Sequence, residues 1–289
     1  MVLSRYRDVA AALRDPLCSI AGGAVDENAH RKMREQAHRL YSSARIAAWQ
    51  PEFASMARRI AESLNVDDEE AELIQDLAEP WSLDVAALVT GLDAAEARRL
   101  APAARIIFDA GASPDLRLES TEATLALAAR FPSAAAALHV QAFVALAVSM
   151  PAFLGNAWLA LLQNPNQFDW ISERNAIDEL LRFAGPSIKQ IRLRESERIE
   201  LRLAEANRDP DQFPDPGRLD LRRDAAGHLA FGAGPHACAG ALLVKAATAS
   251  ILPVFAEHFR QARLLRAEPY GGDAIRGHRV YVTRKPLSL

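Results

Sequence analysis

Residues 231–240 read FGAGPHACAG, and an alanine-rich helical pattern, ALLVKAATASILPVF, follows directly. The glycines Gly232, Gly234 and Gly240 allow backbone conformations and close approaches that a side chain would block. Cys238 lies where the helix is expected to begin, and there the helix dipole and the unpaired backbone N–H groups stabilise a thiolate. The segment therefore predicts a tight loop that holds one sulfur atom at a helix N-terminus.

The residues of this loop leave four interpretations of Cys238 open. A free cysteine is often a small buried hydrophobe. A nucleophilic cysteine needs a base, but His236 is only two residues away, and neighbours at that spacing rarely face each other. A phosphate loop would carry a GK[ST] ending or a G-x-G-x-x-G register, and this segment has neither. The fourth interpretation, an axial haem ligand, explains every small residue in the stretch, since glycines let the backbone lie flat against a planar cofactor.

Helical periodicity dominates the chain and predicts a mainly α fold. We expect helices over residues 5–14, 28–42, 51–64, 69–90, 94–110, 119–130 and 173–183, and a long one from near residue 238. Alternation in IKQIRLRESERIELRL and in the tail HRVYVTRKPLSL predicts short strands. The proline-rich stretch NRDPDQFPDPGRLDLRR predicts a meander over the surface. Because no linker divides the chain, residues 1–289 are expected to form a single domain.

One apolar run, residues 142–162, is long enough to span a bilayer. It contains Ser149, Pro151 and Asn156, and no basic cluster flanks it closely, so we expect a helix buried in the core and no membrane span. Pro151 lacks an N–H and clashes with the carbonyl of Ala147. The run is therefore expected to bend at this turn.

The charge and the cysteines exclude some classes of protein. The net charge of -3 is close to balance, so we expect no nucleic-acid partner. Cys18 and Cys238 are the two cysteines, and their separation predicts no disulfide framework. The first sixteen residues have no apolar region or cleavage site typical of a secretory signal. A cytoplasmic location is expected.

The loop also matches a family signature, F-x-x-G-x-H-x-C-x-G, at every fixed position, and on this ground the chain resembles the cytochrome P450 family. Glu179 and Arg182 resemble the family's E-x-x-R pair, and NRDPDQFPDPGRLD resembles its meander, where Arg218 would complete a buried triad. His30 and Arg34 in AHRKMR resemble a pair that binds haem propionates. RYRDVAAALRDP resembles the helix before the substrate-access loop. These motifs occur in family order and imply a P450-like fold with a reduced β part.

The resemblance implies haem b (iron protoporphyrin IX) as cofactor, with its iron bound by Cys238. The implied haem-binding residues are His30, Arg34, Arg192, Phe231, Gly232, His236 and Gly240. The cationic ones among them would pair with the propionates, whose buried charge needs such partners.

The chain departs from the family on the apolar run. The family's A-G-x-[DE]-T motif falls on residues 145–149, ALAVS, so that Ala145, Val148 and Ser149 are the expected distal residues. Val148 replaces an acid that helps to order proton-carrying water, and Leu146 replaces a glycine and would narrow the distal pocket. The chain is also short for the family: the N-terminal helix and strand region and a strand hairpin are expected to be missing.

The implied function is a haem-thiolate oxidoreductase, with monooxygenation of a small apolar molecule of the secondary-metabolism type. Ferredoxin and ferredoxin reductase would supply electrons, and a homodimer is expected. The alternatives are a haem-thiolate enzyme without conventional oxygen activation (peroxide-driven, dehydratase or isomerase type) and a non-catalytic haem-binding protein.

Overall fold

The structure is a computed structural model that describes residues 1–289 apart from 21–26, 65–69, 108, 110, 196 and 284–289. Helices form most of its regular structure, which confirms the mainly α prediction. They are α1 (Tyr6–Arg14), α2 (Glu27–Leu40), α3 (Ser43–Ser63), α4 (Glu79–Thr90), α5 (Ala94–Ile106), α6 (Pro114–Ala128), α7 (Ser133–Val144), α8 (Met150–Gln163), α9 (Ala176–Ala184), α10 (Leu203–Ala206) and α11 (Ala241–Phe259). Between them lie the π-helical turns η1 (Ile74–Ala78) and η2 (Ala145–Ser149) and the 3-10 turns η3 (Pro165–Trp170) and η4 (Gly234–His236).

The strands of the described residues form two small sheets. The first has the order β1-β5-β4-β2, with β1 (Val2–Leu3), β2 (Ser19–Ile20), β4 (Gln190–Arg194) and β5 (Glu197–Leu201). Its centre is the antiparallel hairpin β4–β5, as the alternating pattern of this stretch predicts. The second has the order β3-β7-β6, with β3 (Ala71–Glu72), β6 (Arg263–Gly271) and β7 (Arg276–Thr283).

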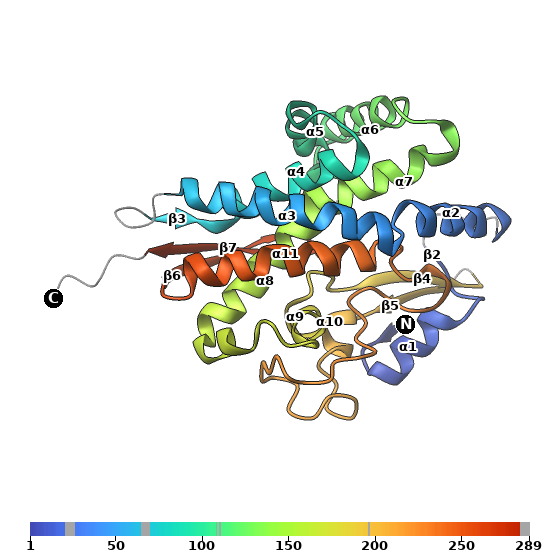
Figure 1. Ribbon diagram of the computed structural model, residues 1–289. Helices are drawn as coiled ribbons and strands as arrows, with labels where there is room; N and C mark the ends of the chain where they lie inside the picture. The colour runs from blue at the N-terminus through green and yellow to red at the C-terminus, as the bar shows by residue number, and fades with distance from the viewer. Residues whose placement is uncertain (21–26, 65–69, 108, 110, 196, 284–289) are drawn as a thin grey trace.

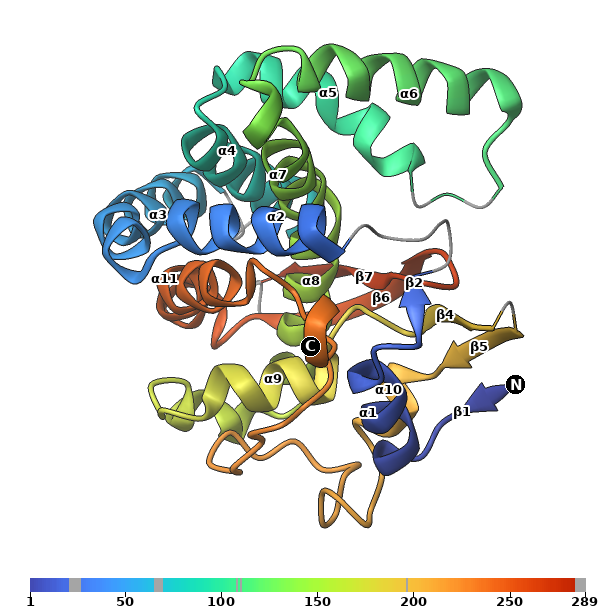
Figure 2. The ribbon, with the colours of Figure 1, turned by 90° about the vertical axis from the view of Figure 1, so that its right-hand side faces the viewer.

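The core is organised around the continuous rod α7–η2–α8, which runs obliquely through the molecule in Figure 1. On α8, Phe153, Trp158 and Leu161 are fully buried, and the Trp158 ring stacks on Phe255 of α11 with centroids 4.7 Å apart. Helix α11 in turn lies beside α3, as Figures 1 and 2 both show. Because a Cβ at Gly155 would overlap the carbonyl of His278, only glycine lets β7 pass this close to α8. The apolar run is thus a core helix.

Length and composition alone would let two helical stretches of the described residues cross a bilayer, Ala135–Gln163 and Ala241–Phe259. However, 56% and 44% of their most apolar windows are buried inside the protein. Core helices of soluble proteins pass the same test, so these stretches are weak evidence for a membrane span.

Several element boundaries differ from the sequence prediction. Helix α3 begins at Ser43 and contains Pro51, because Ile46 and Phe53 on either side of the proline are both buried against the core. The stretch predicted as a helix from residue 69 begins with strand β3, and α6 begins at Pro114, where Ser113 caps the helix by accepting from Leu116 N. Strand β6 was not predicted, because most of its residues are exposed and apolar and polar residues do not alternate regularly along it.

Candidate functional site

The glycine-rich loop folds as a compact turn that ends at the start of α11. The Cys238 N–H donates to the carbonyl of Phe231 over 2.8 Å, and Ala237 N–H donates to Gly234 O. Gly232 and Gly234 have φ of +68° and +71°, a region that residues with side chains rarely adopt. A Cβ at Gly234 would also overlap the backbone of Leu13, so the loop packs directly on α1. These constraints fix the position of Cys238 ahead of the first turn of α11.

Cys238 faces a cavity of about 470 Å³, which explains why its side chain is accessible although it lies deep in the molecule. Burial raises the pKa of the Cys238 thiol, while the Gly240 N–H and the charge of Arg34 act to lower it. Most of the cavity wall is apolar. It is lined by Ile20, His30, Met33, Arg34, Tyr41, Leu138, Gln141, Ala142, Ala145, Leu146, His236, Ala237, Cys238, Ala239, Gly240, Leu243 and Val244.

Basic side chains gather at one edge of this cavity. The His30 and His236 rings lie 4.4 Å apart, and Arg34 donates from Nη1 to the carbonyl of Ala237. Desolvation and the neighbouring charges of His30, Arg192 and Arg34 lower the pKa of His236. This edge of the cavity is therefore cationic in character and would attract an anionic group.

Arg192 belongs to the same edge. On strand β4 it pairs with Ile20 of β2, and directly opposite residues of an antiparallel pair project to the same face. Since Ile20 lines the cavity, Arg192 lies on that side of the sheet. Arg192 is only 5% exposed, and burial lowers the pKa of its guanidinium. The structure therefore holds a buried arginine close to His236 with no carboxylate bound to it among the described residues.

The residues present fit a haem. Arg192 Nε and His236 Nδ1 are buried and have no hydrogen-bond partner in the described part of the chain, which is costly unless an anionic partner binds there. A planar apolar ring system with carboxylates on one edge would satisfy these groups and fill the apolar cavity. Cys238 at the helix N-terminus supplies the thiolate that a haem iron accepts.

The haem-binding residues expected from the sequence are placed as follows. His30, Arg34, His236, Gly240 and Cys238 line the cavity. The others do not line it: Arg192 lies on its cationic edge, Gly232 shapes the loop, and Phe231 packs on the core and on His228, with ring centroids 5.6 Å apart. Tyr41 was missed by the sequence reasoning, although His30, Arg34 and Tyr41 follow the spacing of one helix face.

The expected distal residues are not brought together in this cavity. Ala145 lines it, but Val148 lines a separate cavity and Ser149 lines neither. The reason is geometric: residues 145–149 form one π-helical turn, in which Met150 N–H donates to Ala145 O, so Val148 is turned further away from Ala145 than residues three positions apart are on a regular α-helix. Leu146 is 1% exposed and reaches the sulfur cavity, as expected for a residue that narrows it.

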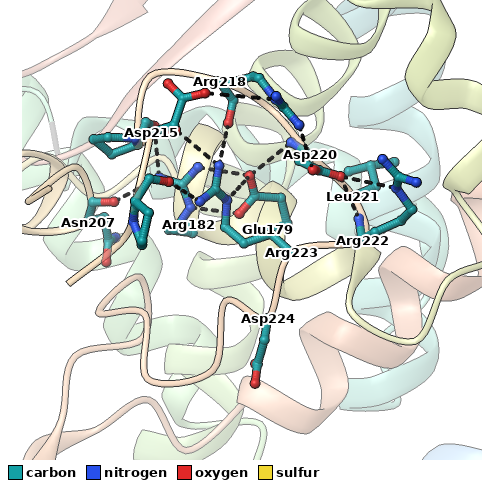
Figure 3. Close-up of polar contacts among 12 residues, drawn as sticks. Glu179, Arg182, Asn207, Asp215, Arg218, Asp220, Leu221, Arg222, Arg223 and Asp224 are labelled. Atoms are coloured by element: carbon teal, nitrogen blue, oxygen red, sulfur yellow. Dashed lines mark hydrogen bonds and ion pairs between the residues drawn. The ribbon is translucent and has the colours of Figure 1, made fainter.

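The meander is tied to α9 by a buried carboxylate (Figure 3). Glu179 is fully buried and receives Arg182 Nε at 2.7 Å and Nη2 at 2.8 Å. Arg182 also donates to the carbonyls of Asn207 and Pro216, so that the pair connects α9 to the start and the middle of the meander. The expected contact between Glu179 and Arg182 is therefore present.

The third member of the triad was predicted wrongly. Arg218 is 62% exposed at its side chain and pairs with Asp220 at 2.9 Å, on the outer side of the meander. Instead, Arg223 Nε lies 3.1 Å from Glu179 Oε1, and its side chain is 14% exposed. The meander turns back at Asp215, which has a positive φ of 51°, and this reversal carries Arg218 outward and returns Arg223 to the buried carboxylate.

Comparison with known proteins gives one consistent result. No family model matches the chain. Among curated relatives, PikC, a cytochrome P450 monooxygenase of Streptomyces venezuelae, is 38% identical over 110 residues, which cover 32% of this chain and 26% of PikC. Cytochrome P450 119 of Sulfurisphaera tokodaii is 31% identical over 41% of this chain and 36% of its own length. CYP199A2 of Rhodopseudomonas palustris is 26% identical over 84% of this chain and 75% of its own length. The chain thus matches 26% of the length of PikC and 36% of that of cytochrome P450 119.

Solved structures extend the likeness over nearly the whole chain. CYP164A2 of Mycobacterium smegmatis superposes with a TM-score of 0.85 at 21% identity, covering 98% of this chain and 90% of its own. P450BioI, solved with an acyl carrier protein, gives 0.85 at 21% identity, with 98% and 91% covered. LnmA, a hydroxylase of the leinamycin biosynthetic pathway of Streptomyces atroolivaceus, gives 0.81 at 22% identity, with 98% and 89% covered. At these identities the structures establish the fold.

Proposed function

This chain belongs to the cytochrome P450 family, and on that premise we propose that it is a haem-thiolate oxidoreductase that monooxygenates a small, apolar molecule. The observation that carries the proposal is the position of Cys238, which faces an apolar cavity that has a cationic edge. The relative PikC is named a monooxygenase, and the fold neighbour LnmA a hydroxylase of a biosynthetic pathway, which supports a role in secondary metabolism.

We propose haem b as the form of the cofactor. Covalent attachment of c-type haem needs a C-x-x-C-H motif, and with Cys18 and Cys238 as its cysteines the sequence has none. Cys238 would ligate the iron, and His30, Arg34, Arg192 and His236 would bind the propionates. The bound haem would supply the oxidative chemistry that no side chain of this protein can perform.

The protein would control three properties of the site. The Gly240 N–H, which acts to lower the pKa of Cys238 against the larger effect of burial, would donate to the sulfur and help to stabilise an iron-bound thiolate. The apolar walls formed by Leu138, Leu146 and Val244 would exclude water and select apolar substrates. On the α7 side of the cavity, the side chain of Gln141 offers the hydrogen-bonding groups, and no carboxylate lines this cavity among the described residues.

The test compares two supplies of oxidising equivalents. Purified protein is loaded with haem and given a panel of small apolar substrates, either with ferredoxin, ferredoxin reductase, NADPH and oxygen, or with hydrogen peroxide alone. Hydroxylated product in the first mixture supports the proposal. Turnover only with peroxide, or dehydration and isomerisation products without oxidant, would replace it with a haem-thiolate enzyme that bypasses oxygen activation. Haem binding without turnover in any mixture would leave a haem-binding protein.

The same proposal includes a ferredoxin-type electron donor and a cytoplasmic location. Homodimer formation stays a prediction, and sedimentation velocity tests it. Residues 1–289 are proposed to act as one domain.

A further inference from the structure

A second cavity, of about 310 Å³, lies on the other side of the π turn η2. Its wall shares no residue with the sulfur cavity: Ala145 and Leu146 face the sulfur, whereas Ala147 and Val148 face this second space. The full lining is Ile74, Glu79, Arg105, Ile106, Asp109, Ala147, Val148, Pro151, Ala152, Tyr270, Gly271, Gly272, Ile275, Gly277 and Arg279. The space is therefore enclosed by the end of α5, the start of α8 and the hairpin β6–β7.

On the hairpin side of this cavity, close packing restricts the positions of the side chains. Tyr270 and Gly277 are paired across β6 and β7. A Cβ at Gly277 would lie 2.8 Å from the Tyr270 ring and 2.8 Å from Ala152 Cα, so glycine is required for the ring and α8 to pack this closely. The Tyr270 ring is thus held in one place. Its hydroxyl is buried and has no hydrogen-bond partner among the described residues.

An ion pair forms the polar part of the wall. Arg105 Nη2 lies 2.8 Å from Glu79 Oε2, and the two side chains are 44% and 24% exposed. Burial raises the pKa of the Glu79 carboxyl, although Arg105 and Arg279 act to lower it. Glu79 can accept a hydrogen bond from a ligand and Arg105 can donate one, side by side. The pair therefore matches a group that both donates and accepts, such as a hydroxyl.

The charge of the wall favours an uncharged ligand. Glu79 and Asp109 carry negative charge, and Arg105 and Arg279 carry positive charge, so the charges balance. Arg279 is also held by Glu72 at 3.6 Å, outside the cavity lining. An anionic ligand would find Arg105 and Arg279 already paired with Glu79 and Glu72 and would lose its hydration on entry. A cationic ligand would face the same loss, offset by the Asp109 carboxylate, which accepts the Gly111 N–H.

We propose that this second cavity is a binding site for a small, uncharged alcohol with an apolar body. The hydroxyl of the ligand binds the Glu79–Arg105 pair, and a small shift of the Tyr270 hydroxyl allows it to donate to the same oxygen. The apolar body packs on Ile74, Ile106 and Val148. This site goes beyond the proposed function, because it requires neither haem nor turnover.

Tyrosines make the proposal directly measurable. Tyr270 lines the second cavity and Tyr41 the sulfur cavity, so protein labelled with 3-fluorotyrosine carries one ¹⁹F reporter in each. Tyr6 and Tyr281 lie outside both cavities, and single Tyr→Phe variants assign all signals. Cyclohexanol is the probe, with methylcyclohexane, cyclohexanecarboxylate and cyclohexylammonium as analogues.

We expect cyclohexanol to shift the ¹⁹F signal of Tyr270 in a saturable way and to leave the Tyr41 signal unchanged. Each analogue is expected to bind with an affinity at least about tenfold lower than that of cyclohexanol. Ile106→Trp fills the cavity and should abolish the shift. Ile107→Trp is the matched control: Ile107 is 45% exposed and does not line the cavity, and this variant should bind as the wild type does.

Three outcomes would overturn the site: a shift of Tyr41 alone, which places the alcohol beside the sulfur; equal binding by the Ile106→Trp variant; and tighter binding of either charged analogue. Thermal unfolding of both tryptophan variants identifies a folding defect. If Ile106→Trp is unstable, Tyr270→Phe is used in its place. Calorimetry then measures the affinity for cyclohexanol, with Tyr281→Phe as the control. An unchanged affinity in Tyr270→Phe would also overturn the site. Repeating the titration with Cys238→Ala separates this site from the haem proposal, because the Tyr270 shift should persist there.

Discussion

Arg223 Nε lies 3.1 Å from Oε1 of Glu179, and this contact joins the last part of the meander to a carboxylate that is fully buried on α9. Breaking a buried pair on one side leaves an incompletely paired charge in the interior. We therefore expect Arg223→Met to lower the free energy of unfolding by about 2–3 kcal/mol, somewhat less than a complete loss of pairing, because Arg182 remains. Urea denaturation measures the change.

Arg218→Met is the matched control for that experiment. Its side chain is 62% exposed and pairs with carboxylates at the surface, so the expected change is within about 0.5 kcal/mol. Equal losses in the two variants would contradict the assignment of Arg223 to the buried triad.

Removal of the sulfur should change the spectrum of the haem-loaded protein. Cys238→Ala is expected to lose the red-shifted absorption band of the ferrous carbon monoxide complex that is specific for thiolate ligation, because no other thiol lines the cavity. Cys18→Ala should keep the band, since Cys18 is buried beside Asp15 and lies outside the cavity lining. A thiolate-type band in Cys238→Ala would refute the ligand assignment.

Arg192→Met should have opposite effects on the haem-free and haem-loaded protein. Without haem, Nε of the buried Arg192 has no hydrogen-bond partner among the residues that the structure describes, so its removal is expected to raise the free energy of unfolding by about 1 kcal/mol. With haem the variant loses a propionate partner, and transfer of haem to excess apomyoglobin should be about tenfold faster. Arg194→Met, half-exposed and 3.7 Å from Asp15, is the control for both measurements. Faster haem loss from Arg194→Met than from Arg192→Met would show that Arg194, and not Arg192, binds the propionate.

Leu146→Ala should enlarge the sulfur cavity at a cost in stability. Leu146 is 1% exposed, and truncation of such a leucine typically lowers the free energy of unfolding by about 2–4 kcal/mol. At the same time, imidazole should bind the haem-loaded variant more tightly, as a spectral titration would detect. Leu146→Met preserves volume and is expected to cost less than about 1.5 kcal/mol with unchanged imidazole affinity.

His228 should make the protein acid-sensitive. The Ala230 N–H donates to its Nδ1, so its Nε2 carries the proton and faces Asp178 at 3.2 Å. Burial lowers the pKa of His228 below its ordinary value of 6.5, despite the opposing effect of Asp178, and Lys245 and Arg182 lower it further. Folding therefore favours the neutral ring, and this contribution is present above pH 6.5 and is lost as the pH falls from there toward the folded-state pKa.

The check on His228 is the unfolding free energy as a function of pH, with the imidazole titration followed by NMR. His228→Gln should flatten the acid limb of the stability profile. An imidazole that titrates above pH 6.5 in the folded protein would contradict the prediction.

The sequence alone was enough to predict the fold class and the sulfur site of this protein, because its strongest signals are local. The glycines and Cys238 within ten residues specify a tight turn before a helix, and steric limits on φ and a helix dipole act over that same distance. The spacing of Glu179 and Arg182 places them on one helix face, and the apolar run could only be a core helix or a membrane span. Mainly α structure and the sulfur site follow from such neighbours, whereas the basic residues of the site were expected from the resemblance to the P450 family.

Tertiary structure decided what depends on where distant segments meet. Arg218 and Arg223 are equally plausible partners of Glu179 in the sequence, and only the reversal of the meander at Asp215 brings one inward. The side of the rod to which Val148 turns depends on the π turn before Pro151, since one extra residue per turn reorients every side chain in it. The second cavity likewise exists because Gly277 and Tyr270 bring a C-terminal hairpin against α8, more than a hundred residues earlier in the chain.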